Sequence, residues 1–286
     1  MFDKISRSWT MAGQCWNVLK EDPALLVFPL MSTGALLLLL ASFAAPVWSV
    51  FHHLDPVQTP GSTTHTARLM YYLMLGAFYV INYSVMMFFN TGLIAVALRR
   101  LDGEDATVGE GLQLAWDNVS SILAYAVIAA TIGAILRGIE ERVGFVGRIV
   151  IGFIGAGWTI ASSMTLPVLV VENVGPIEAI SRSLELMKRN WGENIVGNGG
   201  ISLGVAVIAV PCMLLALFVM MTAFASREPS HIIPAVILMG AVVFGLGLIS
   251  TTLHSIYTAA LYRFATGAKD STGIDQDLLA GAFRPK

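Results

Sequence analysis

The sequence predicts an all-α integral membrane protein with about six transmembrane helices, and three observations support this prediction. The chain has 286 residues, of which 56% are hydrophobic and 13% are charged, and its mean hydropathy is +0.72. Globular domains carry about 25% charged residues, so the composition favours a membrane protein. Six apolar runs reach the roughly 20 residues that a spanning helix needs. Segments with helical apolar periodicity and charged faces precede some of these runs.

The apolar runs follow one another with short polar connections, so we expect a single domain over residues 1–286. The candidate spans are 24–51, 67–98, 119–136, 149–171, 195–225 and 232–262. The first is too long for the apolar part of a signal peptide and follows an amphipathic segment, which favours a span. The first, second, fifth and sixth exceed the bilayer thickness and must tilt, kink or protrude. The prolines expected to kink or end spans are Pro29, Pro46, Pro167 and Pro211.

One segment occurs twice in the chain. The tetrapeptide Ile-Ser-Arg-Ser at 5–8 recurs at 180–183, and Trp16 aligns with Trp191. In each copy the apolar residues repeat at intervals of three and four, which places them on one face of a helix. These residues are Phe2, Ile5, Trp9, Ala12 and Trp16 in the first copy, and Ile177, Ile180, Leu184, Met187 and Trp191 in the second. We therefore predict cytoplasmic amphipathic helices at the membrane surface over 1–20 and 176–191.

A third copy of this helix is one of two interpretations of the segment after the second span. Thr107 and Glu110 have the spacing of a capping box. An apolar stripe follows, formed by Val108, Leu112, Ala115 and Val119. The stripe is compatible with three repeats of interfacial helix plus transmembrane hairpin, or with an unrelated short helix.

The distribution of Lys and Arg predicts that both termini are cytoplasmic, in a bacterial inner membrane. These residues concentrate in the N-terminal segment, the connections after the second and fourth spans, and the tail 263–286. The connection between the third and fourth spans is the exception, because it contains Arg137, Arg142 and Arg148. If the third and fourth runs were re-entrant, that connection would move to the other side.

Polar side chains inside the predicted spans form the first candidate site. The sixth span carries Thr251, His254, Ser255 and Thr258 on one helical face, and the other spans contribute Asn82, Asn90, Thr159 and Ser162. Ionisable residues in spans usually face the bundle interior, so we expect this stripe to face inward with His254 hydrogen-bonded. The opposite face, with Ile249, Leu253, Ile256 and Ala260, is expected to face lipid or an apolar helix. The stripe serves either as hydrogen bonding between helices or as a polar path for a solute.

The second candidate site is the interfacial surface of the repeated helix, whose cationic side chains we expect to meet anionic lipid headgroups. Its residues are Arg7, Trp16, Arg182, Lys188, Arg189 and Trp191. Glu178 and Glu185 lie four residues before Arg182 and Arg189, so part of this charge is paired within the helix.

No sequence motif in the chain carries a known chemistry, so we expect neither an enzyme nor a cofactor. His52, His53 and His65 lie in a predicted loop without diagnostic metal-ligand spacing. Cys15 and Cys212 are expected to be structural thiols. The net charge of −2 gives no basic excess for nucleic acid.

Several segments resemble a family of bacterial integral-membrane proteins of unknown function. They are 167–172 (Pro-Val-Leu-Val-Val-Glu), Pro176, Ser181-Arg182-Ser183, Trp191-Gly192-Glu193 and 259–265. The repeat is also similar to the membrane domain attached to some glycerophosphodiester phosphodiesterases, whose catalytic domain has no counterpart in this sequence. The resemblance implies an architecture and no reaction.

Two functions are compatible with these features. The first is a structural or accessory membrane protein that binds lipid or partner proteins through its interfacial helices. The second is a channel or permease that uses the polar faces of the second, fourth and sixth spans. The expected partners are membrane lipids, further copies of the chain or other membrane proteins.

Overall fold

The computed structural model describes residues 13–53, 63–226 and 228–267, and every regular element in them is helical, with no strand. This confirms the all-α fold class. Residues 13–21 are helical, whereas 1–12, which include Arg7, lie outside the described residues. The elements that follow are η1 (Pro23–Leu26), α2 (Val27–His53), α3 (Thr63–Leu101), α4 (Val108–Asp117), α5 (Val119–Glu140), α6 (Phe145–Ser162), α7 (Thr165–Val171), α8 (Pro176–Ser226) and α9 (Pro229–Thr266).

Six helical stretches in the described residues are long and apolar enough to cross a membrane, which confirms the number predicted. They are Pro23–Ala44, Tyr72–Leu101, Val119–Glu140, Phe145–Val171, Val205–Ser226 and Ser230–Thr266. Residues 176–191 are helical, as predicted, but they do not form a separate helix, because α8 continues without a break from Pro176 to Ser226. Their location at the membrane surface remains a prediction. The residues between the two predicted elements, Gly192-Glu193-Asn194, include no proline, so no backbone donor is missing. At 51 residues, α8 is about 77 Å long, far more than the bilayer needs.

Proline positions explain two of the helix boundaries. Pro167 lies in the first turn of α7, and its ring would clash with the carbonyl of Ser163, four residues earlier. The chain accordingly leaves α6 at Ser162 and resumes as α7 at Thr165. Pro29 lies in the first turn of α2, where the 3-10 helix η1 gives way to an α-helix. Pro211 lies inside α8, and the kinks expected there and at Pro46 remain predictions.

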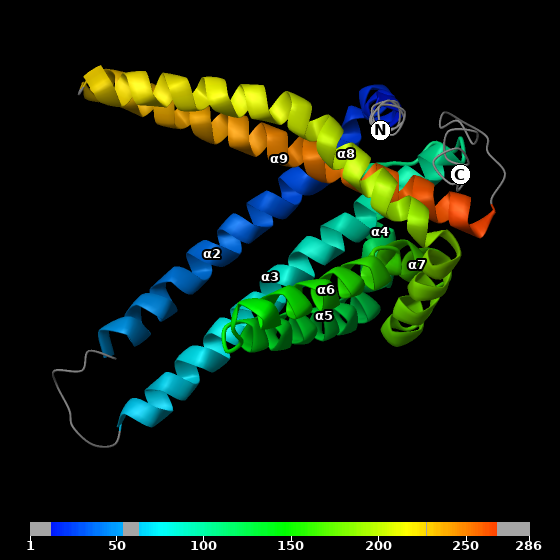
Figure 1. The fold of residues 1–286 in the computed structure, drawn as a ribbon, viewed down its shortest axis with the longest axis horizontal. Coiled ribbons are helices and arrows are strands. Elements are labelled where there is room, and N and C mark those ends of the chain that lie inside the picture. The colour runs from blue at the N-terminus through cyan, green and yellow to red at the C-terminus, as the bar shows by residue number, and fades with distance from the viewer. Residues whose placement is uncertain (1–12, 54–62, 227, 268–286) are drawn as a thin grey trace.

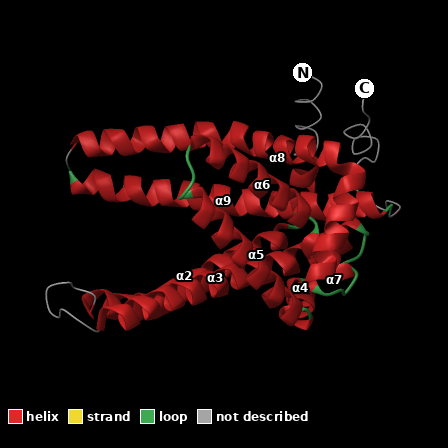
Figure 2. Ribbon diagram, turned by 60° about the horizontal axis from the view of Figure 1, so that its bottom comes forward, coloured by secondary structure: helices red, strands yellow, loops and turns green. Residues whose placement is uncertain are grey.

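The long helices form three consecutive pairs that extend from a common region, which we call the junction. Figure 1 shows α2–α3, α5–α6 and α8–α9 leaving this region, with α2 and the α8–α9 pair diverging. Figure 2 shows the same pairs side by side, with α4 and α7 at the junction. The duplication that the sequence suggested remains a prediction.

The hydrophobic core lies at the junction, where every helix pair contributes to it. Its largest fully buried side chains include Leu25, Phe28, Leu93, Ile94, Ile122, Met164, Leu169, Met187, Ile256 and Leu261. Away from the junction most large apolar side chains are exposed; Leu38 of α2 is 75% exposed and Phe218 of α8 is 63% exposed. Exposed leucine and phenylalanine on long apolar helices suit contact with lipid rather than water.

Two glycines set the position of α4 against α3. A Cβ added to Gly111 would lie 2.8 Å from the Gly92 carbonyl oxygen and 2.8 Å from Cζ of Phe28. A Cβ on Gly92 would similarly lie 2.8 Å from Cε1 of Phe28. The two backbones therefore touch, with the Phe28 ring beside them. Only glycine permits this approach at both positions.

Candidate functional site: the polar junction

The ends of the helix pairs are tied together by charged and polar side chains, which we call the junction cluster. Its members are Asp22, Arg99, Arg100, Asp102, Asp105, Glu110, Glu172, Arg182, Glu185, Tyr262 and Arg263. Arg100, at the end of α3, forms ion pairs with Asp22 at 2.8 Å and with Asp105 at 2.7 Å. It also donates to the Ala106 carbonyl at 3.0 Å. Arg100 thus holds the segment before η1 and the α3–α4 connection to one helix end.

Arg263 of α9 reaches the same end of α3. Its guanidinium lies 2.6 Å from Oδ1 of Asp102 and donates to the Leu101 carbonyl. The side chain is 8% exposed, so its charge requires these partners to be tolerated. The carbonyls at a helix C-terminus lack intrahelical donors and carry partial negative charge, which an arginine complements. Arg263 therefore caps α3 from a helix more than 160 residues away in the sequence.

Tyr262, the neighbour of Arg263, connects α9 to the segment between α7 and α8. Its hydroxyl donates to Oε1 of Glu172 at 3.2 Å. The same carboxylate oxygen accepts from Nε of Arg182 at 3.4 Å, and Arg182 Nη1 donates to Glu185 at 3.1 Å. The hydrogen bond to Glu185 and the charge of Glu172 raise the pKa of Arg182 above its ordinary value. Arg182 is thus engaged by two carboxylates.

Ser183, the last residue of the repeated tetrapeptide, is fully buried against the break between α6 and α7. Its hydroxyl accepts a hydrogen bond from the Met164 amide at 3.1 Å. The break removes Met164 from the regular α6 ladder, because the amide of the preceding Ser163 already turns back to Ile160. Ser183 supplies the acceptor that this buried amide needs.

The apolar residues in the first turns of α8 are divided between the protein interior and the surface. Ala179, Ser183 and Met187 are buried, whereas Ile177 is 74% exposed and Leu184 is also exposed. The predicted apolar face is therefore divided, because Met187 packs in the core whereas Ile177 and Leu184 remain exposed. Small Ala179 and Ser183 allow α8 to approach the α6–α7 break. The side chains of Arg189 and Trp191 lie outside the described part of the chain.

The other short helices at the junction also expose aromatic or cationic groups. Lys20 places its ammonium 5.7 Å from the ring of Trp16, on the helix over 13–21. In α4, the capping box of Thr107 and Glu110 is present, as the sequence predicted. Trp116 of α4 is 68% exposed and makes an edge contact with Phe88.

The α9 polar stripe is turned differently from the prediction. Ser255 is buried and donates to Oδ1 of Asn90 in α3 at 2.6 Å, which links two predicted site residues. Thr251 and His254 are exposed, so the prediction that they face inward is wrong. On the opposite face, Leu253, Ile256 and Ala260 are buried, which agrees with packing against an apolar helix, one of the two alternatives for that face. The apolar side of α9 faces the interior of the junction, where Tyr257 and Leu261 belong to the hydrophobic core.

Most remaining polar groups of the predicted stripe bond to their own helices. Thr159 donates to Gly155, Ser162 to Trp158 and Thr258 to His254, in each case to a backbone carbonyl. Asn82 is half-buried. Hydroxyls paired in this way do not require a water-filled path. Among the described residues, no group of His, Cys, Asp and Glu could hold a metal ion.

Sequence reasoning missed Arg263 and Glu172 as contact residues, although they lie in the segments that carry the family resemblance, and it placed Tyr262 on the polar face of the sixth span without its partner. The signal available was their position, since each follows a long apolar run. Their partners are distant in the sequence, so spacing could not identify them.

The fold and the junction define a multi-pass α-helical membrane protein. The chain belongs to the family of unknown function DUF6159, whose model matches residues 69–273. No curated protein and no solved structure matches the chain. The similarity to the membrane domain of glycerophosphodiester phosphodiesterases therefore receives no support from these comparisons.

Proposed function

We propose that this protein is an accessory membrane protein of the bacterial inner membrane that binds anionic lipid at its junction end. In this proposal both termini are cytoplasmic, and the three helix pairs are repeats of one unit. The observation that carries it is the exposed face of the first turns of α8. Ile177, Leu184 and Lys188 lie at positions i, i+7 and i+11, which form one helical face, and all three are exposed.

Such a face suits the boundary between acyl chains and headgroups. Exposed apolar side chains can enter the lipid while a lysine beside them meets phosphate. Trp16 with Lys20 and the exposed Trp116 supply the same combination on neighbouring helices, and tryptophan is enriched at this depth. Arg182 is a weaker lipid ligand than the sequence suggested, because Glu172 and Glu185 already engage it.

The permease hypothesis is less well supported. It requires polar faces that line a path, whereas Ser255 bonds to Asn90 and Thr159 and Thr258 bond to their own helices. A partner protein would bind this face through the same apolar and charged contacts as a lipid. The lysines beside exposed apolar side chains favour anionic lipid as the ligand.

The test is lipid binding by the full-length protein in detergent, measured by native mass spectrometry with phosphatidylglycerol and with phosphatidylcholine of equal chain length. The wild type is expected to prefer phosphatidylglycerol. A cation near an anionic surface contributes about 1 kcal/mol, so Lys20→Gln and Lys188→Gln should each weaken that preference about fivefold.

Arg148→Gln is the matched control, because Arg148 is an exposed cation near the start of α6, away from the junction. It should leave the preference unchanged. Equal binding of both lipids by the wild type, or equal effects of the control and the lysine variants, would contradict the proposal. Solute flux through liposomes containing the protein would favour the permease instead.

A further inference from the structure

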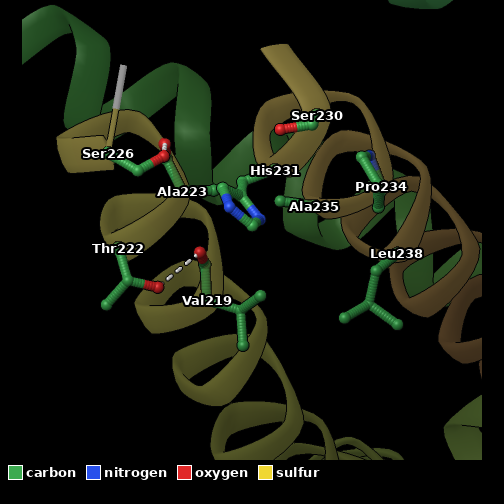
Figure 3. A pocket seen from close by; sticks show the side chains of 9 residues that line it. All are labelled: Val219, Thr222, Ala223, Ser226, Ser230, His231, Pro234, Ala235 and Leu238. Carbon is green, nitrogen blue, oxygen red and sulfur yellow. Dashed lines mark hydrogen bonds between the residues drawn. The ribbon is translucent and has the colours of Figure 1, made fainter. Parts of the chain in front are cut away.

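A pocket lies at the tip of the α8–α9 pair, where the chain turns from one helix to the other. Its volume is about 420 Å³, and Figure 3 shows the His231 imidazole projecting into the space between the two helices. The lining residues are Val219, Thr222, Ala223, Ser226, Ser230, His231, Pro234, Ala235 and Leu238. We call this the tip pocket. It lies at the opposite end of α8 from the face in the proposed function.

The hydroxyl groups of the tip pocket have already used their protons. Thr222 donates to the Val219 carbonyl at 2.8 Å, as Figure 3 shows, and Ser226 donates to the Ala223 carbonyl at 2.6 Å. Ser230 donates to Oε2 of Glu228 at 3.3 Å. Each hydroxyl has one proton and two lone pairs. Ser226 also accepts from the Glu228 amide at 3.4 Å, which leaves its oxygen one lone pair. Toward a molecule in the pocket, the three oxygens can therefore only accept.

Two further acceptors adjoin these oxygens. Pro234 lies within α9 and has no amide proton, so the Ser230 carbonyl lacks the donor that the fourth residue along a helix supplies. The Glu228 carboxylate lies 3.7 Å from Nε2 of His231 and adds a negative charge beside the pocket. Among the described residues, the polar side of the site is thus rich in acceptors and carries a carboxylate, with the His231 imidazole beside it.

The other side of the pocket is apolar. Val219 and Leu238 line it, and Ala223 and Ala235 are buried beneath it. The candidate spans Val205–Ser226 and Ser230–Thr266 end and begin here, so the pocket lies where acyl chains meet headgroups. A ligand that fits both sides has a donor-rich cation next to an apolar chain.

We infer that the tip pocket binds the primary ammonium headgroup of a zwitterionic membrane lipid of the phosphatidylethanolamine type. A primary ammonium has three N–H donors for the hydroxyl oxygens and the Ser230 carbonyl, and Glu228 complements its charge. A trimethylammonium headgroup has no N–H donor. An anionic headgroup would bring negative charge to Glu228 and would leave the acceptors without protons.

The test is native mass spectrometry of the full chain titrated with phosphatidylethanolamine and with phosphatidylcholine of identical acyl chains. The wild type is expected to bind the ethanolamine lipid more tightly. Thr222→Val keeps the side-chain shape and removes one acceptor, and Glu228→Gln removes the charge. Each should reduce the preference about threefold to tenfold, the range for one hydrogen bond, and leave the affinity for the choline lipid unchanged.

Thr131→Val is the matched control, because Thr131 is an exposed α5 threonine whose hydroxyl also bonds to its own helix, at the Val127 carbonyl. It should preserve the preference. Equal binding of the two lipids by the wild type would overturn the inference, as would an unchanged preference in Glu228→Gln. Full displacement by chain-free phosphoethanolamine at equal concentration would overturn the lipid as occupant. Lys188→Gln should not alter this preference, so the outcome is independent of anionic-lipid binding at the junction.

Discussion

The Ser183 hydroxyl accepts a hydrogen bond from the Met164 amide at 3.1 Å, and both residues are fully buried. This contact joins α8 to the break that Pro167 imposes between α6 and α7. It gives the serine of the repeated tetrapeptide a structural role in its second copy. The neighbouring Arg182 ties the same turn of α8 to Glu172, and through it to Tyr262.

Ser183→Ala should destabilise the protein by about 1–3 kcal/mol, because it leaves the buried Met164 amide without an acceptor. Thermal unfolding in detergent measures the effect. Ser181→Ala is the control, since Ser181 is exposed two residues earlier on the same helix. Similar unfolding temperatures for the two variants would argue against the role of this contact.

Gly111→Ala should destabilise the packing of α4 on α3, because the new Cβ would meet the Gly92 carbonyl oxygen and the Phe28 ring at 2.8 Å. Overpacking of this kind costs about 1–3 kcal/mol. Gly109→Ala, on the same helix, meets only the Thr107 hydroxyl at 3.9 Å and should be neutral or stabilising, since alanine favours helices. The two substitutions should therefore change thermal stability in opposite directions or by clearly different amounts. A stable, unperturbed Gly111→Ala protein would show that the close approach is not required.

Spin labels on single cysteines should distinguish the two faces of α9 in a background without Cys15 and Cys212. Labels at Thr251 and His254, which are exposed, should relax strongly with oxygen dissolved in the bilayer. Labels at Leu253 and Ile256, which are buried, should relax weakly. The reverse order would restore the inward-facing stripe that the sequence suggested.

Cys15 should resist thiol reagents in the folded protein, because burial raises its pKa to about 12. The thiolate is the reactive form, and only about one part in 10⁴ is ionised at pH 8 for such a pKa. The rate of modification should rise about tenfold per pH unit up to pH 11, provided the fold persists. Burial disfavours the Cys15 thiolate in the folded protein. The neutral thiol therefore contributes fully to the stability of the fold below the pKa that it has in the unfolded chain. That contribution is lost as the pH rises toward 12. Rapid labelling at pH 7 without unfolding would contradict the buried environment.

Reporter fusions at residue 60 and at the C-terminus should lie on opposite sides of the membrane, with the C-terminus cytoplasmic. Six spans return the chain to the side on which it began, and the loop after the first span lies across the bilayer. Reporters on the same side of the membrane would contradict the six-span topology.

The sequence determined the class of protein and the number of candidate spans. Apolar runs of about 20 residues and helical periodicity are local properties, so they also identified the capping box of Thr107 and Glu110 and the break caused by Pro167. Composition alone indicated a membrane protein, because charge is costly in a bilayer wherever it occurs along the chain.

The tertiary structure decided which face of each helix is buried. The α9 stripe was misassigned because the rule that polar residues face inward compares protein with lipid, and does not say which neighbouring helix packs there. In this protein Ser255 is the residue of the α9 stripe that packs against α3, because it donates a hydrogen bond to Asn90. On α8, the side that carries the small Ser183 packs against the break between α6 and α7. The pairing of Arg263 with Leu101 and Asp102 likewise joins residues far apart in the sequence, and only the packing of α9 on α3 brings them into contact.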